Sequence, residues 1–174
     1  GDEIFMDMEA AMKRIPPHSA EAEQAVLGAM LMNKEAITVA SEILSGDDFY
    51  QTAYGILFNS MVELFHAGKP VDLITLQEYL KEKDVPPEIS SMEFARDLLM
   101  GTQTSANIKS YAEIVREKSI MRRLIKVNEE TANACYLQNQ PLEEILEDAQ
   151  KQVFALAETG NSEEYVPIKQ VVLN

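Results

Sequence analysis

The longest regular pattern of hydrophobic positions lies in the second half of the chain, from Ser105 to about Glu158. No proline or glycine occurs between Ser105 and Tyr136, and most of these residues favour the helical state. Asn139-Gln140-Pro141 then interrupts the pattern, and Pro141 suits the first turn of a second helix. A connection this short predicts an antiparallel helical hairpin with a long first arm and a shorter second arm.

The apolar positions of the long arm change sides along its length. At about 100° per residue, one side of the first half carries Ile108, Tyr111, Ala112 and Val115. From residue 120 onward the opposite side is apolar and spans roughly 160°, more than one neighbouring helix requires. The members of this second arc are Ile120, Met121, Leu124, Ile125, Val127, Ala132 and Cys135. We expect the first stripe to pack on the preceding part of the chain and the second on the short arm, with a spare apolar edge for another partner. A single bulky contact with the short arm is the alternative.

The short arm has one narrow apolar stripe, which we expect to be its contact with the long arm. The stripe consists of Leu142, Ile145, Leu146, Ala149, Val153 and Leu156.

Residues 19–103 read as a head of five short helices joined by polar turns, with no strand. The predicted helices cover about 19–32, 34–44, 52–67, 73–83 and 90–101. Ser19 and Asp72 are suitable N-caps, and Ser90-Ser91-Met92-Glu93 has the capping-box pattern. The density of large apolar residues in 52–67 indicates the centre of the head. The predicted fold is therefore all-α, with a small globular helical head followed by a long antiparallel hairpin.

Charge narrows the choice of partners. The net charge of −14 argues against a free-standing nucleic-acid binder, because that affinity comes mostly from neutralising phosphates. Residues 109–126 are locally basic, with six basic side chains against two acidic ones, whereas residues 141–164 carry seven acids and one lysine. We expect the basic and acidic arms to complement each other within the hairpin.

No pattern of catalytic or metal-binding residues stands out. Glu63 and His66 have the Glu-x-x-His spacing of di-iron bundles, but such a site needs two of these motifs and further carboxylates. There is no phosphate-binding glycine loop, and Cys135, the single cysteine, falls on the apolar arc and reads as a small buried hydrophobe. We therefore predict no catalytic, cofactor-binding or metal-binding residue. With no disulfide possible, no signal-like start and no apolar run near 20 residues, the chain reads as cytoplasmic and free of membrane spans.

Five short motifs carry a resemblance to a known family. They are Arg14-Ile15-Pro16-Pro17-His18-Ser19-Ala20-Glu21-Ala22-Glu23-Gln24-Ala25-Val26-Leu27-Gly28, Asp48-Phe49-Tyr50, Gly68-Lys69-Pro70-Val71-Asp72 with Thr75, Ser105-Ala106-Asn107-Ile108 with Tyr111-Ala112, and Arg122-Arg123-Leu124-Ile125. In order and spacing they resemble the N-terminal part of the bacterial replicative DNA helicases of the DnaB type.

The resemblance implies the organisation of the chain. Residues 1–18 would be an N-terminal arm, 19–103 the head, 104–160 the hairpin, and 161–174 the start of a linker to a motor domain that lies outside this sequence. ATP and magnesium would bind that motor, so no cofactor is expected here. In this family the N-terminal domains form a collar on a hexameric ring, built from dimers in which hairpins pair, and the collar is where primase docks. A helicase loader is a further expected partner, and DNA is expected to meet only the full-length ring.

Two sets of contact residues follow from the apolar arc and the resemblance together. For self-association, as a dimer or larger, we predict Ile120, Leu124, Val127 and Thr131. For primase docking we predict Phe94, Ile125 and Thr131. Many members of the family have an apolar residue where this chain has Thr131, so we expect weaker docking here.

Two other classes of function remain open at this stage. A small all-helical enzyme would need a compact cleft with perturbed acidic groups. A nucleic-acid-binding regulator would need a basic stripe on the solvent side of residues 109–126.

Overall fold

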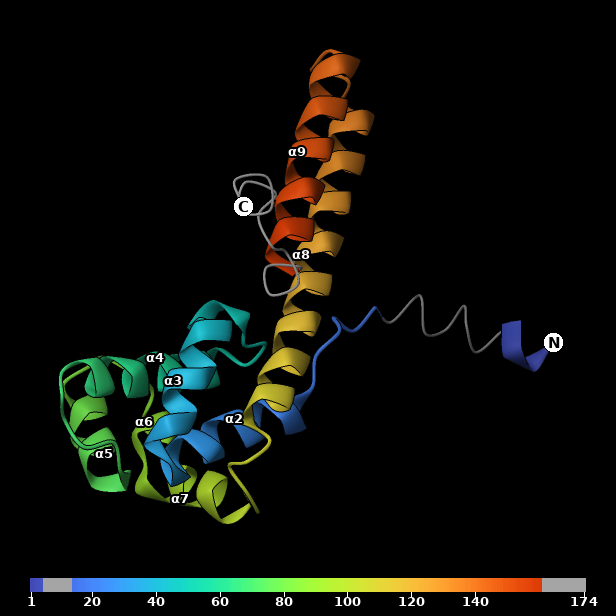
Figure 1. Ribbon diagram of the computed structural model, residues 1–174. Coiled ribbons are helices and arrows are strands. Elements are labelled where there is room, and N and C mark those ends of the chain that lie inside the picture. Colours follow the sequence, from blue (N-terminus) through green and yellow to red (C-terminus); the bar gives the residue numbers. More distant parts are fainter. Residues whose placement is uncertain (5–13, 161–174) are drawn as a thin grey trace, which may run out of the picture.

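The computed structural model describes residues 1–4 and 14–160, and the predicted linker start at 161–174 lies outside them. No strand occurs in these two ranges, so the expected all-α class is confirmed. The head contains α2 (Ala20–Met32), α3 (Lys34–Ile43), the 3₁₀ turn η1 (Gly46–Asp48), α4 (Thr52–His66), α5 (Leu73–Lys81), α6 (Pro87–Ser90) and α7 (Met92–Met100). The hairpin consists of α8 (Ile108–Leu137) and α9 (Leu142–Gly160) and projects away from the head (Figure 1).

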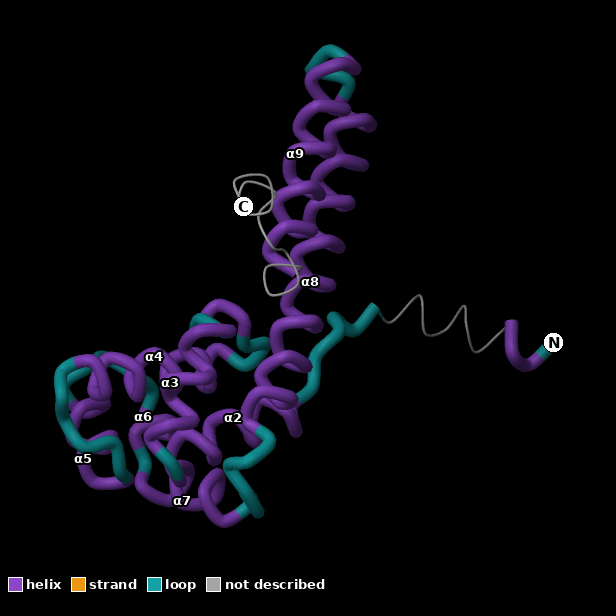
Figure 2. The backbone as a smooth tube through the Cα atoms, viewed as in Figure 1, coloured by secondary structure: helices purple, strands orange, loops and turns teal. Residues whose placement is uncertain are grey.

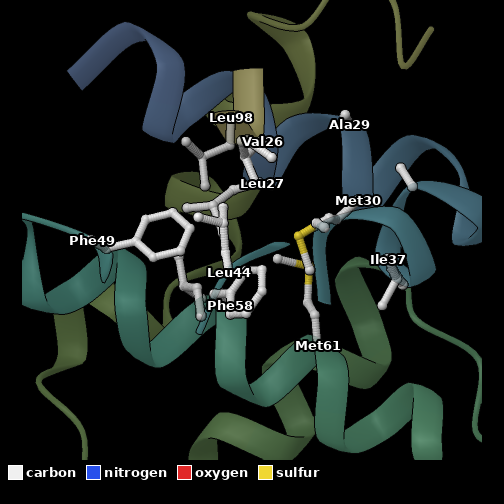
Figure 3. Packing of buried hydrophobic residues seen from close by; sticks show 14 of the residues in the cluster. Val26, Leu27, Ala29, Met30, Ile37, Leu44, Phe49, Phe58, Met61 and Leu98 are labelled. Atoms are coloured by element: carbon white, nitrogen blue, oxygen red, sulfur yellow. The ribbon is translucent and has the colours of Figure 1, made fainter. Parts of the chain in front are cut away.

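Helix α2 shares the centre of the head with α4, whose apolar density predicted a central place. It packs against α3, α4, α7 and α8, and Val26, Leu27 and Met30 on its core side are fully buried. Small residues allow this central position: a Cβ added to Gly28 would lie only 2.8 Å from the carbonyl oxygen of Leu98 in α7. Figure 3 shows α2 side chains meeting those of α4, including Phe58 and Met61. The density of large side chains thus identified α4 as a core helix. Small residues such as Gly28 allow α2 to pack closely on its neighbours.

Side-chain caps begin two of the predicted helices as expected. The Ser19 hydroxyl accepts a hydrogen bond from the Ala22 amide at 3.1 Å, and Asp72 Oδ1 accepts from the Ile74 and Thr75 amides at 2.9 Å. The predicted capping box at Ser90 is wrong. Pro87 starts the one-turn helix α6, which takes up Ser90, and the cap of α7 moves to Ser91.

The Asp72 cap predicts a pH-dependent contribution to stability. Hydrogen bonds from the Thr75 amide, and further ones from the Thr75 hydroxyl and the Ile74 amide, lower the pKa of the Asp72 carboxyl. A lowered folded-state pKa means that the stabilisation is complete above the ordinary carboxyl pKa and is lost as the pH falls through the lowered value. Asp72→Ala should therefore cost about 1 kcal/mol of unfolding free energy at neutral pH, and this cost should fall in acid, where the protonated carboxyl caps the helix more weakly than the carboxylate. Urea unfolding at several pH values measures it, and Asp72→Asn, which caps without titrating, should show no such pH dependence.

The hairpin matches its predicted proportions. At about 1.5 Å per residue, the thirty residues of α8 span about 45 Å and the nineteen of α9 about 28 Å. Figure 2 shows the turn between them at the tip, where Gln138 adopts a left-handed conformation with φ of 51°. The predicted head-facing stripe is confirmed, because Ile108, Ala112 and Val115 are buried.

Candidate protein–protein interface

One side of the hairpin carries a run of exposed apolar side chains, which we call the hairpin face. Their exposed fractions lie between 39% and 66%, which is high for large apolar residues in a helix pair. On α8 these residues lie across the helix from Ile108, Ala112 and Val115, so the hairpin face is turned away from the head. The hairpin face consists of Met121, Leu124, Ile125, Leu142, Leu146 and Val153.

Both arms contribute to the hairpin face, which corrects the single-stripe prediction for the short arm. Ile145 is buried, and Ala149 and Leu156 are half-buried. Leu142 and Leu146 are more than half exposed, although they belong to the same apolar stripe. The physical reason is that one helix covers only a narrow strip of its neighbour. The spare apolar edge predicted for α8 is therefore continued by exposed apolar side chains of α9.

The four predicted self-association residues divide between two surfaces. Leu124 lies on the hairpin face. Ile120, Val127 and Thr131 are half-buried. Figure 1 shows the outer part of α8 projecting from the head with α9 alongside it, so among the described residues the burial of Val127 and Thr131 comes from the packing of α8 on α9. The Thr131 hydroxyl also donates to the Val127 carbonyl oxygen at 2.8 Å, so its polar group is satisfied within α8.

The predicted primase residues do not form one patch within a single chain. Ile125 is exposed on the hairpin face, with Thr131 nearer α9. Phe94 is on the head, half-buried against the core, with its ring centroid 5.8 Å from that of Tyr54. It borders a hollow of about 430 Å³ between α2 and α7. The head and hairpin parts of the predicted surface are thus separate.

A polar joint connects the head to the base of the hairpin, and the sequence reading did not find it. The buried carboxylate of Asp48 is its centre. Asp48 Oδ1 accepts from the Ser119 hydroxyl at 2.8 Å and from Arg123 Nη2 at 2.9 Å, and Oδ2 accepts from the Ser45 amide at 2.8 Å. No described side chain has a buried polar atom without a hydrogen-bond partner, so the cost of burying this charge is offset by its contacts.

Arg122 extends the joint to the N-terminal arm. Its guanidinium donates to the carbonyl oxygens of Pro17 at 2.8 Å and Asp48 at 2.7 Å. The same group lies 5.6 Å from the centroid of the Tyr50 ring, which stacks on His18 with 4.1 Å between ring centroids. One arginine of the hairpin therefore holds the arm and the turn after η1 together.

A second buried acid organises the same turn from within the head. Glu23 of α2 is 1% exposed, and its carboxylate accepts from the Tyr50 and Gln51 amides at 3.1 and 3.2 Å. Gln51 is the N-cap residue of α4, so Glu23 satisfies the N-cap amide in the way that the N3 acid of a capping box would.

The joint changes the interpretation of the basic segment. Arg122 and Arg123 point to the head, not to the acidic short arm, so the expected charge complementarity within the hairpin does not include them. The regulator hypothesis required a solvent-facing basic stripe, but both guanidinium groups are bound by acceptors of the head, although the Arg123 side chain is 42% exposed. Three of the sequence motifs, around His18, at Asp48-Phe49-Tyr50 and at Arg122-Arg123, meet here in space.

The sequence drew attention to Cys135 and to Glu63, and the structure describes the surroundings of both. Cys135 is exposed, so its interpretation as a buried hydrophobe is wrong, since α9 does not cover that side of α8. The Glu63 carboxylate accepts hydrogen bonds from the Tyr79 hydroxyl and from Lys83 Nζ, and the Lys83 contact is the main cause of its lowered pKa. Within 1–4 and 14–160, no group of three or more His, Cys, Asp or Glu is arranged to hold a metal ion. No helix in these ranges is long and apolar enough to cross a membrane.

Comparisons with solved structures support the fold. The N-terminal domain of DnaB helicase from Mycobacterium tuberculosis superimposes with a TM-score of 0.76 at 31% identity, covering 80% of this chain and 99% of that one. The N-terminal domain of DnaB helicase from Helicobacter pylori, described with its interactions with primase, matches with a TM-score of 0.58 at 21% identity, over 67% of this chain and 90% of that one. At that lower identity the likeness concerns the fold alone.

Sequence comparisons agree. The replicative DNA helicase DnaC of Bacillus subtilis is 39% identical over 160 residues, which is 92% of this chain and 35% of that protein. The replicative DNA helicase DnaB of Pasteurella multocida is 40% identical over 145 residues, or 83% of this chain and 31% of that protein. The chain thus spans about a third of the length of these relatives. Residues 15–117 match the model of the DnaB-like helicase N-terminal domain. This chain belongs to the family of DnaB-like helicase N-terminal domains.

Proposed function

We propose that this chain is the N-terminal scaffold of a replicative DNA helicase and acts in DNA replication by assembling subunits and docking primase. The chain matches a segment that makes up about one third of each of two replicative helicases, and this similarity supports the role. ATP hydrolysis and strand separation then belong to the remainder of such a helicase, with ATP and magnesium bound there. We expect the assembled protein to be hexameric, cytoplasmic and served by a helicase loader.

The hairpin face is the observation that carries the proposal. Six large apolar side chains on one side of a projecting hairpin favour association with another apolar surface. A second copy of the hairpin is the partner we propose, since the same face on each copy would give a closed two-fold contact. An ordinary specific contact of about 800 Å² per subunit would cover it. Leu124 is the predicted residue at its centre, whereas Ile120, Val127 and Thr131 act through the α8–α9 packing that shapes it.

Primase docking is proposed at two places. Ile125, at the edge of the hairpin face where a partner hairpin leaves it accessible, is the apolar anchor on the hairpin, and Thr131 lies further along α8 towards α9. Phe94 with its neighbouring hollow is the contact on the head. The solved structure of the Helicobacter pylori domain, described with its interactions with primase, supports the choice of partner. Because the hairpin contact and the head contact are separate, a substitution at Ile125 tests the first and a substitution at Phe94 tests the second.

Titrating the C-terminal domain of the cognate primase into the purified chain tests this proposal. Ile125→Ala should weaken binding by about 2 kcal/mol, roughly thirtyfold, because anchors of this kind carry much of the energy of an interface. Its melting temperature should stay the same, since Ile125 is 44% exposed. Phe94→Ala should lower both affinity and melting temperature, because the ring also packs on Tyr54. Isothermal titration calorimetry with Met100→Ala as an exposed control measures the effect, and unchanged affinity in Ile125→Ala and Phe94→Ala would contradict it.

A further inference from the structure

A second apolar surface lies on the head, on the side of α7 away from Phe94. Two adjoining hollows of about 520 and 590 Å³ meet at Leu31, the residue that lines both. They extend from the end of α2 across the start of α5 to α7. Figure 1 shows these three helices in the head, remote from the hairpin tip. We call this surface the head groove. Its principal apolar residues are Leu31, Phe65, Val71, Ile74, Met92 and Leu99.

The periodicity of α7 separates the head groove from the surface proposed for primase. Met92, Arg96 and Leu99 follow one another at spacings of four and three, so they share one side of the helix. Phe94, Asp97 and Leu98 line the hollow on the other side, towards α2. The two surfaces can therefore be altered independently.

The basic side chains of the head gather around this groove. Residues 19–103 contain five of them, in a segment with fourteen acidic side chains. Lys81 and Lys83 form ion pairs with Glu78 and Glu63. The other three, Lys34, Lys69 and Arg96, all line the head groove, and no ion pair joins them to any residue of the described ranges.

The single acidic residue in the groove, Asp72, offsets only one of these three cations, so the groove keeps a net positive charge. The carboxylate of Asp72 accepts hydrogen bonds from the amides of Ile74 and Thr75 and is occupied in capping α5. Arg96 lies along the groove wall, with Nη2 3.6 Å from the sulfur of Met92. Three cations thus rim an apolar groove in a chain whose net charge is −14.

We propose that the head groove binds an acidic amphipathic segment of a partner protein. Apolar side chains of that segment would fill the space beside Ile74, Met92 and Leu99, and its carboxylates would face Lys34, Lys69 and Arg96. An acidic segment would be repelled by most of this chain's surface, so these cations would also determine where it binds. Nucleic acid fits less well, because apolar walls give nothing to a phosphate backbone and three cations neutralise few phosphates. The site is independent of the hairpin face.

A synthetic peptide tests the proposal. The probe has fourteen residues, with leucine at positions 1, 4, 5 and 8 and Asp or Glu elsewhere, and it is titrated into the intact chain with fluorescence anisotropy and methyl NMR as readouts. We expect methyl shifts at Ile74, Met92 and Leu99, and an affinity that falls as salt is raised. Ile74→Glu should weaken binding at least about tenfold, because its side chain is 66% exposed and is an anchor of the site. Lys69→Gln, a surface change, should weaken binding about threefold and reduce the salt dependence.

Matched controls decide the outcome. Met100→Glu introduces the same charge as Ile74→Glu at an exposed apolar residue of α7 that lies outside the groove lining, and should bind the probe as the unchanged chain does. A peptide in which Gln replaces every acid should bind more weakly. Equal binding of the Gln peptide, methyl shifts on the hairpin face instead of the head groove, or equal loss in Met100→Glu would each overturn the proposal. Groove shifts produced more strongly by a fourteen-nucleotide single strand would also overturn it, in favour of a nucleic-acid site.

Discussion

Replacing Leu124 with glutamate should convert self-associated chains into folded monomers. The side chain lies on the hairpin face at 39% exposure, where a partner hairpin would bury it, and a buried unpaired carboxylate opposes association strongly. Leu146→Glu on α9 should have the same effect, because the hairpin face spans both arms. We expect each change to weaken association at least about a hundredfold, as for a central residue of an interface. Sedimentation velocity measures the change in oligomeric state.

Two comparisons separate loss of association from loss of folding. Gln152→Glu adds the same charge to an exposed position of α9 outside the hairpin face, and should leave association unchanged. Val127→Glu places the charge inside the hairpin and should lower the melting temperature, whereas Leu124→Glu and Leu146→Glu should not. If Leu146→Glu associates like the unchanged chain while Leu124→Glu does not, the interface involves α8 alone and the two-armed face is wrong.

Replacing Asp48 with alanine should weaken both the stability of the chain and the attachment of the hairpin. The change removes the acceptor for Ser119, Arg123 and the Ser45 amide at once. Removing one member of a buried charged pair typically costs about 3 to 5 kcal/mol, and we expect the lower end because Arg123 is partly exposed to solvent. Urea denaturation measures the loss of unfolding free energy.

The neighbouring Asp47 provides the control for this joint. Asp47 is exposed, so Asp47→Ala should change the unfolding free energy by less than about 0.5 kcal/mol. Spin labels on the exposed Cys135 and on a cysteine introduced by Lys69→Cys would report the distance from hairpin to head. That distribution should broaden in Asp48→Ala and stay narrow in Asp47→Ala. An equally narrow distribution in both variants would show that apolar packing alone fixes the hairpin.

Periodicity predicted the elements well because each helix has a strong local signal. The stripe at Ile108, Ala112 and Val115 and the caps at Ser19 and Asp72 depend on neighbours three or four residues away, and all were confirmed. The exceptions were also local in origin. Pro87 started a one-turn helix that competed for Ser90 and moved the cap to Ser91.

Long-range polar contacts could not be predicted in this way. Asp48 and Ser119 are 71 positions apart, and nothing in the spacing around either residue indicates the other. The same limit applies to the hairpin face. The pattern showed that Leu142, Leu146 and Val153 are apolar, but which part of the stripe α8 covers depends on how the two helices pack. The resemblance motifs included Asp48 and Arg122-Arg123, and the structure gives the physical connection between them.

Sedimentation velocity of the unchanged chain, at about 1 to 100 µM in physiological salt, tests most directly whether the hairpin face is a self-association surface. We predict a reversible dimer or larger species with a micromolar or tighter dissociation constant, as an apolar contact of ordinary size would give. A single monomeric species throughout, including at tens of micromolar, would contradict the proposal.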